Sequence, residues 1–152
     1  MTRLANGYGE DFPEAAKRHY NDGVSLASVG RYDSAVYHFG FAIECSMKTA
    51  ILVGGRTMAL HKNFKVHDLT FLTGEVLRLA TYAFGQAGLA LQGLPSAFTL
   101  LESQSGSTGK WVDMRYRRAG IVNSADAAVV EGLAREALSR VLGQFYAHGD
   151  LP

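Results

Sequence analysis

The residues best suited to binding chemistry lie in one basic, aromatic segment, residues 110–120, KWVDMRYRRAG. Its cationic and aromatic side chains face the single carboxylate of Asp113; they are Lys110, Trp111, Arg115, Tyr116, Arg117 and Arg118. Arginine can hold a phosphate with two hydrogen bonds, and aromatic rings can stack on bases. The segment precedes the expected last helix, whose N-terminus attracts anions. These residue types predict a phosphate-binding site, with a solvated basic turn in which Trp111 fills the core as the alternative.

A second candidate is the pair Glu44 and Lys48, one helical turn apart in the apolar run of residues 30–52. The run is apolar around most of a helix, which is typical of a helix at the centre of a bundle. A carboxylate there needs a cationic or hydrogen-bonding partner, because an unpaired buried charge is unfavourable. Two interpretations stay open. Glu44 and Lys48 form a simple i, i+4 pair, or Glu44 orients an arginine of residues 110–120 inside a polar pocket.

Other motifs that could support chemistry are incomplete. Residues 106–110, GSTGK, lack the first glycine and the final Ser or Thr of a phosphate loop, and no strand precedes them. His61 and His67 share one loop, but with a single cysteine they give no recognisable metal-ligand spacing. His38 is expected in the core or on a dimer face. The sequence therefore predicts no catalytic residue, no metal and no cofactor.

The elements that must position these residues are predicted to be helices. Pro13 suits the first turn of a helix over residues 13–29. Gly30 separates that helix from a second one over residues 32–53. The glycine pair at 54–55 provides a C-terminal stop.

Three further helices are expected. A third begins near Asp68, and its apolar positions recur at helical spacing: Leu69, Leu72, Val76, Leu79, Ala80 and Ala83. Its end and the path of residues 85–110 stay open, with a short fourth helix starting from Pro95. Asn123 or Ser124 can cap the last helix, whose stripe is Val130, Ala134, Ala137, Leu138, Val141, Leu142 and Phe145. The prediction is an all-α fold, an antiparallel bundle of about five helices.

Size and composition fit a single folded domain. The chain has 152 residues, 47% hydrophobic and 19% charged, with a flexible N-terminal arm expected over residues 1–12 and one domain over 13–148. A net charge of +1 argues against a surface coated with basic residues for duplex DNA. The lone Cys45, the absence of a secretory signal and the lack of an apolar run of about 20 residues predict a cytoplasmic protein without membrane spans.

In order and spacing, several of these segments resemble the HEPN domain, a small all-α family, over the whole predicted domain. The turn SLASVGRYDSA and the run FAIECSMKTAIL, with Glu44 and Lys48, resemble its first turn and second helix. The His-Asp-Leu at 67–69 is similar to the tripeptide that often opens its third helix. Trp111 followed by Arg-Tyr at 115–116 resembles a pattern seen ahead of the last helix in one branch of the family.

The resemblance implies an antiparallel bundle, commonly a homodimer, that works near nucleotides or RNA. It also implies a toxin–antitoxin or phage-defence system and a nucleotidyltransferase-type partner protein. Many relatives are RNases with an arginine followed closely by a histidine near the last helix. Here no histidine follows the arginines of residues 110–120 before His148, and Arg56 with His61 has the spacing in the wrong loop. The resemblance thus implies binding of a nucleotide or single-stranded RNA, without the usual cleavage motif.

Two other functions stay open: a protein-interaction domain without a nucleotide ligand, and a metal-independent RNase with an unusual residue set. The second predicted helix also resembles a tetratricopeptide repeat, but no second copy follows at a period of about 34 residues. Aromatic side chains beyond the needs of one apolar stripe further predict a homodimer; they include Tyr32, Tyr37, Phe41 and Tyr146.

Overall fold

Every regular element in the described part of the chain is helical. The computed structural model describes residues 11–55, 67–69, 71–72, 74–76, 78, 112 and 119–147. No strand occurs in these ranges, so the predicted all-α class is confirmed for them. The predicted short fourth helix from Pro95 lies outside the described residues, and the count of about five helices therefore stays a prediction.

The first helix, α1, spans Phe12–Ser28. Asp11 caps it, because its side chain accepts a hydrogen bond from the backbone N–H of Glu14 at 3.3 Å. After Ser28 the chain turns through Gly30, whose φ of +77° lies in the left-handed region that favours glycine. The helix begins one residue earlier than predicted, at Phe12, whose side chain is buried in the core. Residues 1–10 of the predicted arm lie outside the described residues.

The second helix, α2, spans Tyr32–Gly55 and lies at the centre of the described bundle. Every residue from 42 to 51 is buried, which confirms the interpretation of this run as a central helix. Its buried hydroxyls are satisfied within the helix: Ser46 and Thr49 each donate to the carbonyl four residues earlier, at 2.8 Å. The glycine pair at 54–55 forms the last two helical residues, so α2 ends slightly later than predicted.

The C-terminal helix is continuous but contains a wider turn. It consists of α6 (Ser124–Ala137), a π-helical segment, η3 (Leu138–Leu142), and α7 (Gly143–Ala147). Asn123 is the cap, since its side chain accepts a hydrogen bond from the backbone N–H of Asp126 at 2.9 Å. Of the two predicted capping residues, Asn123 is therefore the cap, and Ser124 is the first residue of the helix. The π segment is not visible as a sequence pattern; it keeps Val141 and Leu142 buried after α6.

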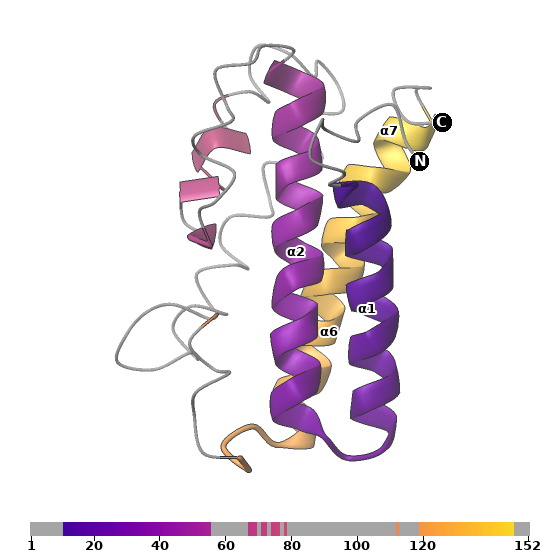
Figure 1. Ribbon diagram of the computed structural model, residues 1–152, viewed down its shortest axis with the longest axis vertical. Helices are drawn as coiled ribbons and strands as arrows, with labels where there is room; N and C mark the ends of the chain where they lie inside the picture. The colour runs from indigo at the N-terminus through magenta and orange to yellow at the C-terminus, as the bar shows by residue number, and fades with distance from the viewer. Residues whose placement is uncertain are drawn as a thin grey trace.

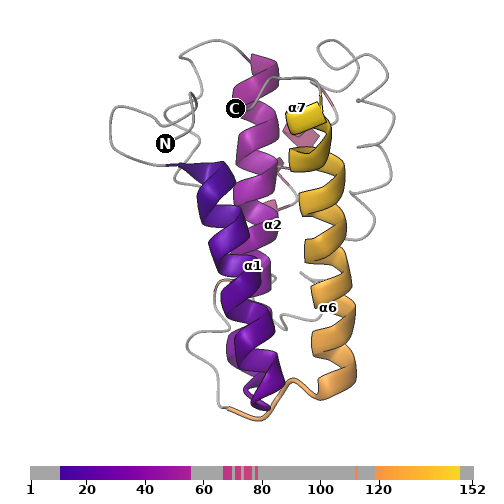
Figure 2. The same ribbon diagram turned by 90° about the vertical axis from the view of Figure 1, so that its right-hand side faces the viewer.

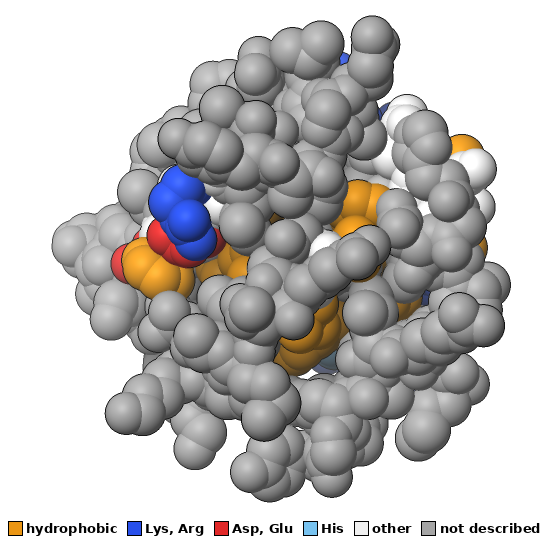
Figure 3. Space-filling model, turned by 90° about the horizontal axis from the view of Figure 1, so that it is seen from above, with side chains coloured by type: hydrophobic (Ala, Val, Ile, Leu, Met, Phe, Trp, Pro, Cys, Tyr) orange, Lys and Arg blue, Asp and Glu red, His pale blue; other side chains and the backbone are white. Residues whose placement is uncertain are grey.

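The three long elements pack side by side. Helices α1 and α2 form an antiparallel hairpin, and the C-terminal helix runs beside it in the direction of α2 (Figures 1 and 2). The hairpin is close because Gly23 carries no side chain: a Cβ there would lie 2.5 Å from the buried ring of Phe39. Seen from above, hydrophobic side chains of the described residues are visible near the centre of the molecule (Figure 3).

The start of the predicted third helix is partly described. Residues 69, 71, 72, 74–76 and 78 are helical. Asp68 caps this segment by accepting a hydrogen bond from the backbone N–H of Phe71 at 2.9 Å. Leu69, Leu72 and Val76 are buried in the core, as their spacing predicts.

Among the described residues, no helix is long and apolar enough to cross a bilayer.

Candidate functional site

At the centre of α2, Glu44 and Lys48 form a buried ion pair, and His67 reaches it from a separate segment. Lys48 Nζ lies 2.7 Å from Glu44 Oε1, and the two residues are only 4% and 2% exposed. His67 Nδ1 is 2.9 Å from Glu44 Oε2 and 3.2 Å from Oε1. These three residues are called the Glu44 cluster below. The sequence anticipates its i, i+4 pair, whereas the contact with His67 comes from the tertiary fold.

The Glu44 cluster is well compensated. Removing a carboxylate from water is unfavourable unless its oxygens gain partners, and here each oxygen has one. The Lys48 ammonium also lies 5.4 Å from the centroid of the Phe12 ring, within the range of a cation–π contact. The structure therefore shows the simple i, i+4 pair with Lys48, and His67 is an additional partner that was not predicted. The alternative partner, Arg115, lies outside the described residues.

His67 connects this buried pair with the surface. Its side chain is 45% exposed, in contrast to the 3% of the Glu44 side chain. The Asp68 cap fixes the backbone next to it. Because Nδ1 faces a carboxylate, the neutral ring carries its proton on Nδ1 and leaves a lone pair on Nε2. Among the described residues, His67 makes hydrogen bonds through Nδ1 only, and Nε2 makes none.

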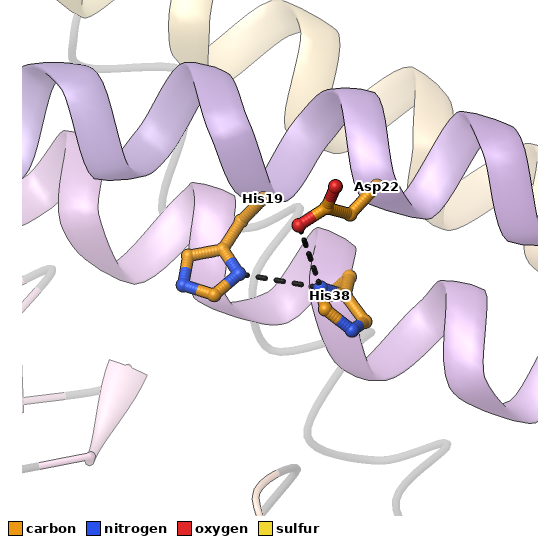
Figure 4. A group of neighbouring side chains, drawn as sticks. All are labelled: His19, Asp22 and His38. Carbon is orange, nitrogen blue, oxygen red and sulfur yellow. Dashed lines mark hydrogen bonds and ion pairs between the residues drawn. The ribbon is translucent and has the colours of Figure 1, made fainter.

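A second polar group, the His19 cluster of His19, Asp22 and His38, lies where α1 faces α2 (Figure 4). The Nδ1 atoms of His19 and His38 are 3.2 Å apart. The Asp22 Oδ2 lies 3.8 Å from His38 Nδ1, which is beyond hydrogen-bonding distance. One ligand-type atom from each residue lies within 4.8 Å of the others. The group is partly open to solvent, since Asp22 is exposed and both histidines are half-buried.

The ring of Phe41 lies between the two clusters. It stacks on His19 with ring centroids 5.0 Å apart, and it meets His67 edge-on at 6.0 Å. Burial lowers the pKa of His19, and the nearby His38 and Arg18 lower it too, while Asp22 and Glu44 act in the opposite direction. The ring of His19 therefore favours the neutral form.

The predicted basic segment is anchored at its C-terminal end. The described chain resumes at residue 119, and Asp33 of α2 accepts backbone hydrogen bonds from residues 120, 121 and 122 at 2.7, 3.1 and 3.1 Å. Burial raises the pKa of Asp33, but these backbone N–H groups outweigh it and hold the pKa below its ordinary value. The predicted ligand residues of the segment itself lie outside the described residues: Lys110, Trp111, Arg115, Tyr116, Arg117 and Arg118.

Sequence reasoning alone missed the His19 cluster. The spacing of its residues matches no known metal motif. The prediction of no metal was based on the lack of such a spacing. The antiparallel hairpin supplies the missing information, because Asp22 and His38 each lie eight residues from Gly30. His19 is one further helical turn from Asp22 on the same helix face. Pairing positions symmetrically about the Gly30 turn is therefore the sequence signal that brings these residues together.

Comparison with known proteins returns nothing for this chain: no protein family, no curated protein and no solved structure matches it.

Proposed function

We propose that the protein is a HEPN-like helical module that binds a nucleotide or a short single strand of RNA through its phosphate groups. The observation that carries this proposal is the contact of Glu44 with His67. The resemblance rests on separate sequence segments. Two of them, the run containing Glu44 and the His-Asp-Leu at 67–69, meet where Glu44 Oε2 lies 2.9 Å from His67 Nδ1.

The energetics of the Glu44 cluster also favour a function. A buried ion pair is weak support for stability, because well-packed apolar residues of the same volume often do as well. Its use here is to hold His67 in one orientation at the surface. The Nε2 atom of His67 accepts a hydrogen bond when the ring is neutral with its proton on Nδ1, and it donates one to a phosphate oxygen when the ring is protonated.

The anchoring by Asp33 supports a ligand site along α2. Glu44 lies eleven positions after Asp33, which is about 16 Å along a helix. Gly120, whose backbone N–H donates to Asp33, lies five positions after Arg115, and five positions of chain can span roughly 17 Å. Arg115 is thus within chain reach of the Glu44 cluster. We propose that it holds the ligand phosphate there, with Arg117 and Arg118 adding positive charge.

The test is calorimetric titration of the purified protein with a panel of nucleotides and short RNA at two salt concentrations. Arg115→Ala should weaken binding tenfold to hundredfold, because one charge-assisted hydrogen bond is worth about 1.5–3 kcal/mol. Arg135→Ala, an exposed arginine on α6, is the matched control and should leave affinity unchanged. Absence of binding at low salt, where phosphate contacts are strongest, would replace this proposal with the protein-interaction module.

We also propose a homodimer, on the resemblance and on the aromatic side chains that exceed one apolar stripe. On the resemblance alone, we propose a place in a toxin–antitoxin or defence pair with a nucleotidyltransferase-type partner. Sedimentation at tens of micromolar tests the first part, and a monomer at that concentration contradicts it. The identity of the adjacent open reading frames tests the second.

One observation favours a second candidate, a metal-independent RNase. A carboxylate that orients a histidine is a common arrangement for a general base, and the His67 side chain is 45% exposed; in this candidate, Nε2 takes the proton from a ribose hydroxyl. Cleavage of RNA that is lost in His67→Ala and Glu44→Gln but retained in His61→Ala would favour this candidate. Absence of cleavage in the unmodified protein excludes it and leaves the binding module.

A further inference from the structure

The His19 cluster has the shape of a metal site. Two of its residues, His19 and Asp22, lie one turn apart on α1, and His38 faces them from α2 (Figure 4). We propose that these three side chains bind one divalent transition-metal ion, with Zn²⁺ as the best match. This proposal stands independently of the nucleotide or RNA ligand.

The distances between the potential ligand atoms fit such an ion. In a tetrahedral zinc site with bonds of 2.0–2.1 Å, neighbouring ligand atoms lie about 3.3 Å apart. The two imidazole nitrogens are 3.2 Å apart, and the Asp22 oxygen is 3.8 Å from one of them. A small movement of the exposed Asp22 side chain completes the geometry. Three protein ligands leave the fourth position for water or a substrate oxygen.

A hydrogen bond accounts for the contact between the two rings, but it leaves the Asp22 carboxylate without a short contact to His38. Two Nδ1 atoms at 3.2 Å can share only one proton, so one ring donates and the other accepts. An N–H on His38 Nδ1 cannot donate to His19 and to Asp22 at the same time. The distance from His38 Nδ1 to the Asp22 oxygen, 3.8 Å, is also too long for a hydrogen bond. A cation at the common centre would instead use both nitrogen lone pairs and balance the carboxylate charge.

The donor atoms of the site suit a transition metal, because neutral imidazole is a common ligand of such ions. Two imidazoles and one carboxylate favour Zn²⁺, Co²⁺ or Ni²⁺ over Mg²⁺ and Ca²⁺, which take oxygen ligands. Because the ligands come from both helices of the hairpin, the bound ion would also link α1 to α2.

The experiment uses the full chain without an affinity tag, treated with chelator and then titrated with Zn²⁺ and Co²⁺ by calorimetry. We expect saturable binding of one ion per chain, and a visible absorption band of Co²⁺ that reports imidazole and carboxylate ligation. His19→Ala, His38→Ala and Asp22→Asn should each weaken binding at least about tenfold, since loss of even an outer-shell partner typically has that effect.

His67→Gln is the matched control, because it removes a half-exposed histidine outside the His19 cluster and should leave metal affinity unchanged. If His38→Ala fails to fold, as judged by circular dichroism, Asp22→Asn decides the question, because Asp22 is exposed. The proposal is overturned by absence of saturable binding, by binding that survives Asp22→Asn at full strength, or by binding that is lost in His67→Gln alone.

Discussion

In the Glu44 cluster both carboxylate oxygens contact a nitrogen within 2.9 Å, whereas in the His19 cluster the Asp22 carboxylate lies 3.8 Å from the His38 ring. The first group is buried apart from His67, and the second is partly open to water. Both lie along α2, with the ring of Phe41 between them. In the Glu44 cluster the charges are compensated within the protein. In the His19 cluster the Asp22 carboxylate could be compensated by an additional cation.

The difference shows how one helix hairpin can hold two kinds of polar group. In the interior, a charged side chain is tolerated only when it is paired, so the residues of the Glu44 cluster orient one another. At a half-exposed position, water can hydrogen-bond a polar atom that has no protein partner. The potential ligand atoms of the His19 cluster can therefore lie close together without each having a hydrogen bond within the protein. Stability should therefore depend strongly on the Glu44 cluster and weakly on the His19 cluster, while metal affinity should show the reverse order.

The largest expected effect is the loss of one partner from the Glu44 cluster. Glu44→Gln should lower the free energy of unfolding by about 3 kcal/mol or more, because the charge of Lys48 then stays buried without its carboxylate. The double variant Glu44→Leu/Lys48→Met removes both charges and should recover most of that loss. Urea unfolding followed by circular dichroism measures both.

This pair of variants also separates structure from binding. If the double variant is stable but no longer binds a nucleotide, the Glu44 cluster serves the ligand. If Glu44→Gln loses less than about 1 kcal/mol, the pair behaves like an exposed one and the contrast between the two clusters is wrong.

The next effect concerns the distance between the helices. Gly23→Ala places a methyl group against the buried ring of Phe39 at 2.5 Å and should destabilise the protein by about 1–3 kcal/mol. Gly132→Ala, where nothing lies within 4 Å of the added Cβ, should instead stabilise α6 by about 0.5–1 kcal/mol. Thermal unfolding distinguishes the two.

Gly23→Ala sharpens the comparison because the clusters differ in how they are assembled. The His19 cluster spans α1 and α2, so pushing the helices apart next to Asp22 should weaken Zn²⁺ binding. The ion pair of Glu44 and Lys48 lies within α2 and should be insensitive to it. Unchanged Zn²⁺ affinity in a measurably destabilised Gly23→Ala protein would show that the spacing of the helices does not define the metal site.

Local patterns were enough to predict the helices that the structure describes. Pro13, Gly30 and the apolar spacing of residues 32–53 define α1 and α2 to within two residues, because each signal acts through the local backbone. The π segment after Ala137 was not predictable in this way, since it depends on how the last helix packs.

The candidate site was predictable only in part. Glu44 and Lys48 can be paired from sequence because helical spacing alone brings them together. The contact of Glu44 with His67 joins positions 23 residues apart, and the His19–His38 contact joins two helices. Such contacts follow from tertiary packing. Whether Arg115 and its neighbours bind phosphate stays a prediction, because these residues lie outside the described part.

A smaller effect is expected for Asp33, a carboxylate saturated by backbone N–H groups. Asp33→Ala should lower the free energy of unfolding by about 1–2 kcal/mol, because it frees the turn before α6. The pKa of Asp33 is depressed on folding, so this contribution is present above its ordinary value of 3.8 and is lost as the pH falls through the folded value. The difference between Asp33→Ala and the unmodified protein should thus shrink under acid; a constant difference would contradict the assignment.

The smallest effect on the metal-free protein is expected for Asp22→Asn. Asp22 is exposed and makes no short contact with His38, so the free energy of unfolding should change by no more than about 0.5 kcal/mol. Zinc should distinguish the two proteins. At a free Zn²⁺ concentration 100 times the Kd of the unmodified protein, its free energy of unfolding should rise by about 2.7 kcal/mol, whereas that of a variant with tenfold weaker binding should rise by about 1.4 kcal/mol. Glu14→Gln removes another carboxylate from α1, one paired with Lys17 at 3.1 Å, and should keep the full zinc response. Equal responses in Asp22→Asn and Glu14→Gln would show that Asp22 is not a ligand, and the contrast between a compensated and an open cluster would then rest on burial alone.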